Sequence, residues 1–454
     1  MLAFSLQALD LYSNGLIFIF LVAMGLVILG WVTKVVPSWF YTPYTESFRG
    51  TAAVVIPVAD ESIDIFHEVV NCVLLNKPSQ LVIVHNGPAN RQLESLTLAL
   101  AQTTSTTVSY HQLDAASKRQ AIIAGVSQLT EDVVVLVDSD TFWGPETLNE
   151  LLRPFADERV GGVTGKQRIQ RTTGSIWERW ADWFELVRSE YQLPAMSVFG
   201  QVGCLPGRTI AFRRKVLVEH ADEFLSDKFL GIHHEVSDDR SLTNYALKMG
   251  LRTVYQSTSA VTTLAPSSFR LFARQQLRWA KGSQYNTIRM FPWMLRHSRF
   301  LLWLYTLDLV IPVLLFSNVI VWISSPFTRA SWTETVLGEA VLVALANGLF
   351  GMGVLISAAI VASWAFMAIR TSRVISIGFS NLIFLPIFML LNFFVLVPIR
   401  VLGLATCGWL TSWGTRHRGQ RHRNRRRRRV VDARQLIPTV SVVLSVALLV
   451  RLGI

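Results

Sequence analysis

A run of aliphatic residues at 133–137 ends directly in two carboxylates, Asp138 and Asp140. Such a run is typical of a strand buried on both faces, and a sheet built from such strands needs helices on either side. Because alternate side chains of an extended segment share a face, we expect both carboxylates to point the same way from the carboxyl edge of the sheet. Two hard oxygen ligands there predict a site for Mg²⁺ or Mn²⁺. The alternative is a turn whose polar side chains bond only backbone amides.

The chain is too apolar for an ordinary soluble enzyme, since 51% of its 454 residues are hydrophobic and only 16% are charged. Residues 15–33 carry no charge over a length that crosses about 30 Å of hydrocarbon as a helix. A cleaved signal peptide is the competing interpretation, but no basic segment precedes this run and no small-residue cleavage site follows it. The composition therefore predicts a catalytic domain set into a membrane. Three cysteines without paired spacing support neither a disulfide framework nor a zinc site, which favours a reducing compartment.

From residue 50 to 290 the pattern alternates between apolar strands, expected at 52–56, 81–84 and 133–137, and helical stretches. This order predicts an α/β domain with a mostly parallel sheet covered on both faces. Ligands of such sheets bind beyond the carboxyl ends of the strands. Polar groups follow each expected strand there, and Lys118 and Arg119 open a helical run from which they could reach a diphosphate.

Three motifs further mark the chain, namely Asp-x-Asp at 138–140, Asp-Asp at 238–239 and Gln-x-x-Arg-Trp at 275–279. In order and spacing they resemble the processive family 2 glycosyltransferases, which include the hyaluronan, chitin and cellulose synthases. The segments 238–244, 253–258 and 413–416 are most similar to hyaluronan synthases. The resemblance covers residues 54–416 and implies a nucleotide-diphospho-sugar transferase fold embedded between transmembrane and interfacial helices.

The resemblance also implies roles for individual residues. Asp138 and Asp140 would hold Mg²⁺ or Mn²⁺, and Asp239, beside Asp238, would be the general base that takes the acceptor proton. The implied nucleotide-binding positions are Ala59, Glu61, Asn86, Lys118, Arg119, Asp138 and Arg278. The implied acceptor-binding positions are Gly207, Arg208, Gln275 and Trp279. The implied gating loop consists of Trp413, Gly414, Thr415 and Arg416.

The implied activity is processive, inverting transfer from UDP-sugars, UDP-GlcNAc or UDP-GlcA or both, into a β-linked polysaccharide that leaves through the helices. One alternative is a transferase that moves a single sugar to a lipid carrier, and another is an inactive, transferase-like channel or scaffold. Two departures put the identity of the sugar in doubt. His85-Asn86-Gly87 stands where many relatives have Asp-Asp-Gly, and Pro206-Gly207-Arg208-Thr209 stands where hyaluronan synthases tend to have Ser-Gly-Pro-Leu.

The expected organisation begins with a membrane helix and interfacial linker at 1–49 and a cytoplasmic transferase domain at 50–290. Transmembrane and interfacial helices at 291–412, a gating-loop-like, arginine-rich segment at 413–435 and a last membrane helix at 436–454 follow. Runs 300–324 and 336–369 are long enough to span, whereas 374–404 is expected to be interfacial or re-entrant because Pro386 and Pro398 interrupt it. The whole predicts a multi-pass protein of the plasma membrane.

Two charged features of this half allow more than one interpretation. Nine arginines at 416–429 supply most of the net charge of +12, and their place between apolar runs favours contact with anionic lipids over nucleic acid. Asp308, at membrane depth, either lines an exit path or reaches the nearer interface.

In the domain, Trp177, Trp180 and Trp183 fall close to one helical face, which favours packing against the core or bilayer over a sugar platform.

Overall fold

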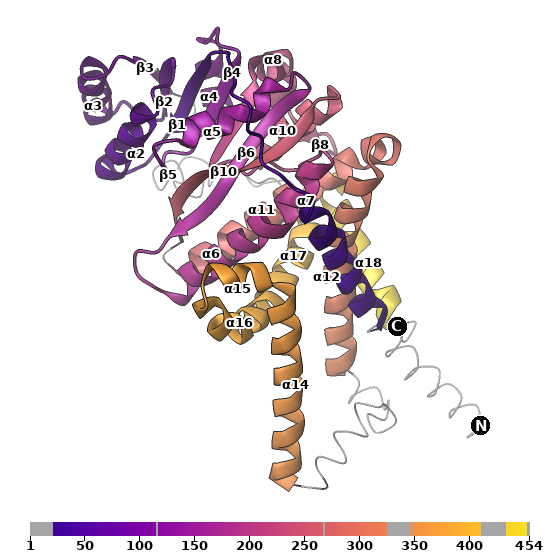
Figure 1. Cartoon of the computed structure of the whole chain (residues 1–454). Coiled ribbons are helices and arrows are strands. Elements are labelled where there is room, and N and C mark those ends of the chain that lie inside the picture. The colour runs from indigo at the N-terminus through magenta and orange to yellow at the C-terminus, as the bar shows by residue number, and fades with distance from the viewer. Residues whose placement is uncertain are drawn as a thin grey trace.

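The computed structural model describes residues 21–114, 117–266, 268–324, 346, 348–409 and 433–451. Within this part of the chain, eight strands form one sheet in the order β3-β2-β1-β4-β7-β6-β10-β5 (Figure 1). The strands are Ala52–Val58 (β1), Gln80–Asn86 (β2), Thr107–Leu113 (β3), Val133–Val137 (β4), Thr141–Trp143 (β5), Val160–Gln170 (β6), Thr209–Arg213 (β7) and Arg252–Leu264 (β10). A hairpin of Lys228–Phe229 (β8) and Ile232–His233 (β9) lies outside it.

Strands β3, β2, β1 and β4 pair in parallel, as do β6 and β10, whereas β7 runs antiparallel between β4 and β6. The predicted α/β class with a mostly parallel sheet is therefore confirmed. The antiparallel strand has a consequence for the site. Because Val137 at the end of β4 pairs with Thr209 at the start of β7, the loop before β7 lies beside the acids that follow β4.

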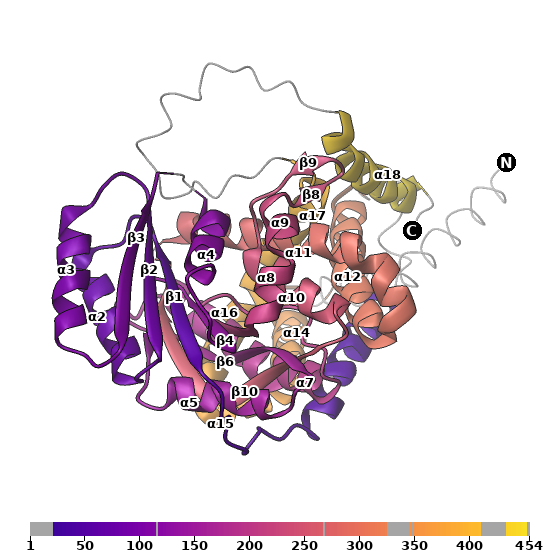
Figure 2. The same ribbon diagram turned by 90° about the horizontal axis from the view of Figure 1, so that it is seen from above.

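Helices cover both faces of the sheet, as the aliphatic strands predicted. Alternate residues of β1 enter opposite cores, with Val54 on the side of α2 and α3 and Val55 on the side of α4 and α10. Figure 2 shows α2 and α3 on one side of the sheet and α4, α8 and α10 on the other. The helices of the domain are Ile63–Leu75 (α2), Arg91–Gln102 (α3), Lys118–Val126 (α4), Thr147–Leu152 (α5), Ile176–Val187 (α6), Leu193–Val198 (α7), Arg214–Glu219 (α8), Ala221–Leu225 (α9), Asp238–Lys248 (α10) and Phe269–His297 (α11).

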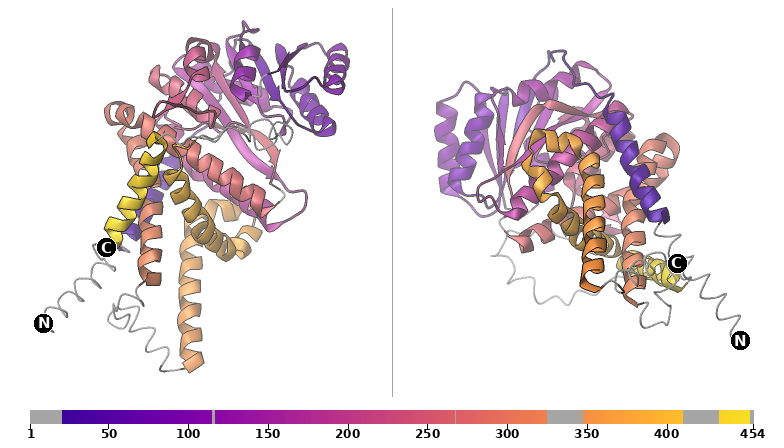
Figure 3. Two further views of the ribbon diagram at one scale, coloured as in Figure 1. Left: turned by 180° about the vertical axis from the view of Figure 1, so that it is seen from behind. Right: turned by 60° about the horizontal axis from the view of Figure 1, so that its bottom comes forward.

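Among the described residues, three helices are long and apolar enough to cross a membrane: Leu21–Ser38, Arg299–Ile320 and Ser380–Ala405. Figures 1 and 3 show α12 and α14 extending away from the domain, while α15, α16 and α17 lie beneath it. The helices of this half are Arg299–Ser324 (α12), Gly348–Arg370 (α14), Ser372–Ile377 (α15), Ser380–Leu391 (α16), Val397–Ala405 (α17) and Ile437–Arg451 (α18).

The stretch expected to break at Pro386 and Pro398 instead runs on without interruption after residue 380. Pro386 lies inside α16, and Pro398 lies in the first turn of α17, directly after a π-helical turn at Asn392–Leu396. A proline inside a helix removes one backbone hydrogen bond, and here neither proline ends the helix. Its α17 part packs on α11 so closely that a Cβ on Gly403 would lie 2.7 Å from Cβ of Ala280.

The tryptophan face of α6 packs inward, as the favoured interpretation held. Trp180 is fully buried, stacks on Phe272 with ring centroids 4.6 Å apart, and donates from Nε1 to Oδ1 of Asn392 at 3.2 Å. Trp183 meets Phe388 of α16 at 5.3 Å. These contacts join the domain to the helices beneath it, and they exclude Trp180 and Trp183 from a sugar-binding surface.

Candidate active site

A cavity of about 370 Å³ opens at the carboxyl end of β4, between the sheet and the helices beneath it. Of the predicted site residues it is lined by Lys118, Asp138, Asp140, Gly207, Arg208, Asp238, Asp239, Gln275, Arg278 and Trp279. Its wall continues into the membrane half through Tyr305, Asp308, Leu309, Leu396, Ile399 and Arg400. One cavity thus joins motifs that lie far apart in the sequence and extends from the transferase domain to α12 and α17.

The two acids after β4 reach this cavity from a turn. The strand ends at Val137, and the N–H of Thr141 donates to the carbonyl of Asp138 at 3.1 Å. The expectation that both carboxylates share a face of an extended segment is therefore wrong, because the backbone turns at Ser139 to enter β5. The turn nevertheless brings both acids to the cavity wall.

Lys118 faces the first of these acids, with Nζ 2.5 Å from Oδ1 of Asp138. It opens α4, whose N-cap Ser117 accepts a hydrogen bond from the N–H of Gln120. Desolvation alone would lower the pKa of Lys118, but the charges of Asp138 and Asp238 outweigh it and raise that pKa above the ordinary value. The ammonium group therefore stays charged at the cavity wall throughout the neutral range.

Arg119 does not join Lys118 in the cavity, contrary to the sequence expectation. Its guanidinium is buried, with Nε 2.7 Å from Oδ1 of Asp238 and Nη1 3.1 Å from Oδ2 of Asp227. Successive side chains on a helix point about 100° apart, so one of two neighbours can face a cavity while the other enters the core. Arg119 fixes the position of Asp238 rather than reaching a diphosphate itself.

Asp239 is the second residue of α10. The residue before the helix, Ser237, adopts a left-handed backbone with φ of 67°. Oδ1 of Asp239 accepts hydrogen bonds from the N–H of Arg240 at 2.8 Å and from Oγ of Ser237 at 3.3 Å. Its Oδ2 faces Sγ of Cys204 at 3.9 Å. The two oxygens thus differ in the contacts that the described residues make, since an N–H and a hydroxyl donate to Oδ1 whereas a thiol, a weak donor, faces Oδ2.

The loop before β7 approaches this acid closely. A Cβ added to Gly207 would lie 3.1 Å from Cβ and 3.5 Å from Oδ2 of Asp239, so glycine leaves room beside the carboxylate that any larger residue would fill. Burial and the adjacent acid raise the pKa of Cys204 to about 12, and the thiol therefore keeps its proton. The space at Gly207 can admit a hydroxyl to Oδ2.

The environment of Asp239 raises the pKa of its carboxyl group. Desolvation, and then the charge of Asp238, raise this pKa above the ordinary value in spite of the N–H of Arg240. If Asp239 is the base that the resemblance implies, it must be ionised, and activity would be lost as the pH falls through this raised pKa. We expect the acid limb of kcat/KM to lie above the range of an ordinary aspartate, while UDP binding stays constant over that limb. An acid limb at or below that range would contradict the assignment.

The motif on α11 presents three side chains to the cavity from one helical face. Gln275, Arg278 and Trp279 are spaced i, i+3 and i+4, which places them side by side. Ser268 caps the helix by accepting a hydrogen bond from the N–H of Leu271. The guanidinium of Arg208 lies over the indole of Trp279, with Cζ of Arg208 5.8 Å from the ring centroid.

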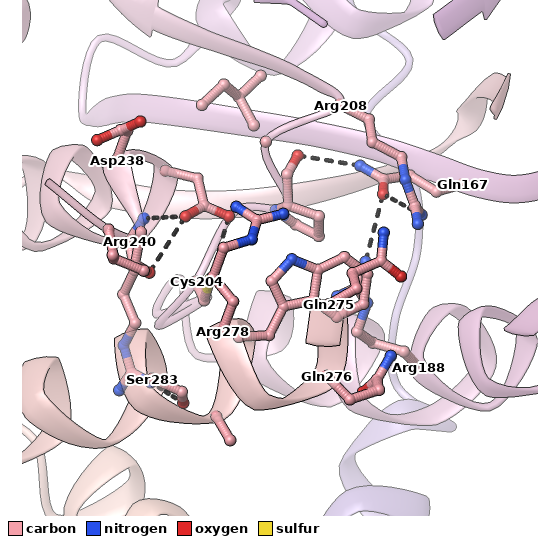
Figure 4. A pocket seen from close by; sticks show the side chains of 18 of the residues that line it. Gln167, Arg188, Cys204, Arg208, Asp238, Arg240, Gln275, Gln276, Arg278 and Ser283 are labelled. Atoms are coloured by element: carbon pink, nitrogen blue, oxygen red, sulfur yellow. Dashed lines mark hydrogen bonds between the residues drawn. The ribbon is translucent and has the colours of Figure 1, made fainter. Parts of the chain in front are cut away.

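Several residues of the cavity carried no sequence signal. Arg240 donates to Oγ of Ser283 at 2.5 Å and to Oγ1 of Thr287 at 2.8 Å, and it lies 4.0 Å from the ring centroid of Tyr305. Arg188 occupies a π-helical turn, a form of helix that is frequent at functional sites. The residues of such a turn have no pattern by which it could be predicted from the sequence. Figure 4 shows Gln167, Arg188 and Arg208 on one side of the cavity and Asp238 and Arg240 on the other.

Besides Arg119, three predicted nucleotide-binding residues lie outside the lining of this cavity. Ala59 follows β1, and Glu61 meets the cavity edge by accepting a hydrogen bond from Oγ of Ser139 at 3.2 Å. Asn86 ends β2 and is 2% exposed. The expected gating loop at 413–416 and the arginine tract lie outside the described residues.

Asp308 contributes to the cavity from α12. Its Oδ1 lies 3.8 Å from Nζ of Lys34 and 3.9 Å from Nη1 of Arg400, so helix Leu21–Ser38, α12 and α17 each supply one charge. Asp308 and Arg400 both line the cavity. A polar lining at Asp308 stays a prediction, and the observation behind it is the pair of ionic contacts on the cavity wall.

Comparison with known proteins places the domain among glycosyl-transferring enzymes. The model of the family described as "Glycosyltransferase like family 2" matches residues 50–282. A hyaluronan synthase from Streptococcus pyogenes is 27% identical over 401 residues, which cover 85% of this chain and 88% of that protein. An N-acetylglucosaminyltransferase from Mesorhizobium japonicum is 28% identical over 303 residues, which cover 65% of each protein.

A solved structure shares the fold. The mannosyltransferase PcManGT from Pyrobaculum calidifontis, in complex with GDP-Man and Mn²⁺, superposes with a TM-score of 0.56 at 17% identity. The match covers 74% of this chain and 91% of that one. At this identity the likeness concerns the fold alone, and it agrees with the sheet and helices described above.

Proposed function

Because the chain belongs to glycosyltransferase family 2, we propose that it is a processive, inverting hexosyltransferase that polymerises UDP-sugars into a β-linked polysaccharide. The observation that carries the proposal is the single cavity, which contains the acids and the α11 motif and continues into α12 and α17. A product made in this cavity would begin its path between apolar helices. We further propose that the protein is multi-pass in the plasma membrane, with the transferase domain in the cytoplasm.

The geometry supports a direct displacement with Asp239 as the base. An acceptor hydroxyl beside Gly207 gives its proton to Oδ2 of Asp239 as its oxygen attacks the anomeric carbon of the donor sugar. The bond from that carbon to the diphosphate breaks on the opposite side, so an α-linked donor yields a β-linked product. Lys118 and Arg278 stabilise the charge that develops on the leaving UDP, and Trp279 offers an apolar face to the acceptor sugar.

Asp138 and Asp140 are the residues that would hold the divalent cation. No group of three or more His, Cys, Asp or Glu side chains able to bind a metal occurs in the described part of the chain. Two carboxylates on a cavity wall instead fit Mg²⁺ or Mn²⁺ that takes its other oxygens from the diphosphate and water. The cation, when bound, supplies screening of the charge on the leaving group. Mn²⁺ in the mannosyltransferase of related fold supports this choice.

Removal of the cation provides a direct test of this assignment. We expect EDTA to lower UDP release more than about 10²-fold, with recovery on addition of Mn²⁺ or Mg²⁺, because the leaving diphosphate then carries its charge unscreened. Asp140→Asn is expected to show a comparable loss even with metal present. Asp64→Asn, an exposed position in the first turn of α2, serves as the control. Full UDP release in EDTA would contradict a metal at the Asp138 turn.

The donors to test first are UDP-GlcNAc and UDP-GlcA, because hyaluronan synthase is among the relatives. The purified protein is incubated in lipid or detergent with each donor and with both together, and UDP release is measured. The product is then sized and digested with linkage-specific glycosidases. A long polymer cut by β-specific enzymes supports the proposal. A single sugar on a lipid carrier would replace it with the non-processive alternative, and no UDP release from any donor would favour the inactive channel or scaffold.

The remaining partners follow from the same proposal. The growing polysaccharide would pass Asp308 and Arg400 at the membrane end of the cavity, where their charges keep the wall polar. Anionic lipids would bind the arginines at 416–429, which flank the apolar helices in the sequence. Nucleic acid is not among the partners that we propose.

A further inference from the structure

Two arginines of the cavity, Arg188 and Arg208, take no part in the reaction described above. Both contact Glu185, with Nη1 of Arg208 2.8 Å from Oε1 and Nη2 of Arg188 2.7 Å from Oε2. Both also donate to Oε1 of Gln167, at 3.0 Å from Arg208 and 3.3 Å from Arg188. The four side chains come from β6, α6, the π-helical turn and the loop before β7, so the fold assembles a cluster that no single segment contains.

The arginine cluster carries more positive than negative charge, and among the described residues Nε of Arg188 and Oε2 of Glu185 make no hydrogen bond. It contains two guanidinium groups and one carboxylate. Among the described residues, the acceptors engage Nη1 of Arg208 and Nη2 of Arg188, and Nε of Arg188 is buried without a hydrogen-bond partner. The side chains of Glu185, Arg208 and Arg188 are 2%, 13% and 22% exposed. An excess cation in such a partly buried place favours an anion from a ligand beside it.

The place of the cluster indicates which part of the substrate carries that anion. Arg208 lies over the indole of Trp279, and its neighbour Gly207 abuts Asp239, so the cluster borders the position of the reacting sugars. The diphosphate has other cations, since Lys118 lies at the Asp138 turn and Arg278 lies between the cluster and Asp238 in Figure 4. The anion that meets Arg188 and Arg208 is therefore on a sugar.

We propose that Arg188 and Arg208 form a subsite for the carboxylate of a uronic acid, which selects an acidic sugar over a neutral one. The planar guanidinium fork matches a carboxylate in two parallel hydrogen bonds, a geometry that lysine does not offer. Glu185 and Gln167 hold the two forks in place, and the carboxylate of Glu185 offsets one of the two positive charges. The inference rests on the proposed function and specifies its substrate. The uronic acid is either the donor sugar or the terminal unit of the acceptor.

The test compares acidic and neutral substrates in wild type and in two variants, Arg188→Gln and Arg208→Gln. A donor arm measures kcat/KM for UDP-GlcA and for UDP-GlcNAc, and an acceptor arm uses oligosaccharides that end in a uronic acid or in a neutral sugar. We expect the acidic-to-neutral ratio to fall about 10- to 150-fold in one arm, as loss of a hydrogen bond to a charged group predicts. Arg208→Lys, which keeps the charge, is expected to recover only part of that ratio.

Two measurements separate selection from a purely structural role. The control Arg159→Gln changes an exposed arginine whose ion pair with Asp157 lies at the surface, and its ratio should match wild type. Thermal unfolding is recorded for every variant. Equal losses for acidic and neutral substrates in both arms, with or without a lower Tm, would overturn the inference. So would a wild-type enzyme that releases UDP from neutral donors and uses a uronic acid in neither arm, although the proposed function would then stand. No UDP release from any donor would overturn both.

Discussion

Asp239→Asn is expected to lower kcat by about 10²- to 10⁴-fold while leaving UDP binding unchanged. The substitution keeps the shape of the side chain and an oxygen for the N–H of Arg240, but it removes the basic oxygen that faces Cys204 and Gly207. The nucleotide groups at Lys118 and Asp138 lie on another element and are not altered. Initial rates of UDP release give kcat, and calorimetric titration with UDP gives the binding constant.

The control for this variant is Asp222→Asn, an exposed position on α9 outside the cavity, which should retain wild-type kcat and UDP affinity. An Asp239→Asn enzyme with a wild-type rate would remove Asp239 from the mechanism. A loss of UDP binding equal to the loss of rate would point to the nucleotide site instead.

Asp227→Asn is expected to destabilise the protein by about 3–5 kcal/mol, because it breaks a buried ion pair from one side. Asp227 pairs with Arg119 at 3.1 Å and with Arg289, and Oγ of Ser241 donates to it at 3.1 Å. Its side chain is 1% exposed and that of Arg119 is 2% exposed. Removal of the acid leaves Arg119 with Asp238 alone, and it leaves Arg289 without a carboxylate among the described residues. Equilibrium unfolding in detergent measures the loss.

A matched surface variant sets the scale for that result. Asp157→Asn removes ion pairs with Arg159 and Arg252, whose side chains are 75% and 32% exposed, and exposed pairs contribute about 1 kcal/mol or less. If Asp227→Asn cost no more than Asp157→Asn, the buried network would not be holding α4 against α10. The activity of Asp227→Asn should also fall, because Arg119, which positions Asp238, then loses one of its two carboxylate partners.

The sheet could be predicted from the sequence because local runs of aliphatic residues indicate its strands. Residues 133–137 are aliphatic throughout, and β4 has those same bounds. The expected strands at 52–56 and 81–84 lie inside β1 and β2. The antiparallel β7 could not be predicted in the same way, because its place between β4 and β6 depends on pairing across the whole domain.

The acids and the α11 motif could be predicted because each is a short pattern with a chemical reason. The direction of single side chains could not. Lys118 and Arg119 are adjacent and alike in charge, yet one lines the cavity and the other is buried on Asp227 and Asp238. Tertiary packing decides between them, because Arg119 is directed at buried carboxylates beneath α4 whereas Lys118 is directed at Asp138 on the cavity wall.

Gln167, Glu185, Arg188 and Tyr305 illustrate what has no sequence signal at all. Each is unremarkable among its neighbours, and each reaches the cavity only because segments far apart in the chain meet there. The prolines at 386 and 398 show the opposite failure, in which a strong local signal for a break is overridden by a π-helical turn and by packing of α17 on α11.

Reconstitution into sealed lipid vesicles tests whether one cavity both makes a polymer and passes it into the membrane helices, as we propose. Labelled UDP-sugars and metal are supplied outside vesicles whose transferase domains face outward, and the product is sized with and without added glycosidase. We expect a long polymer that resists the enzyme until detergent opens the vesicles. A short product, or a long one that is fully digested from outside, would contradict it.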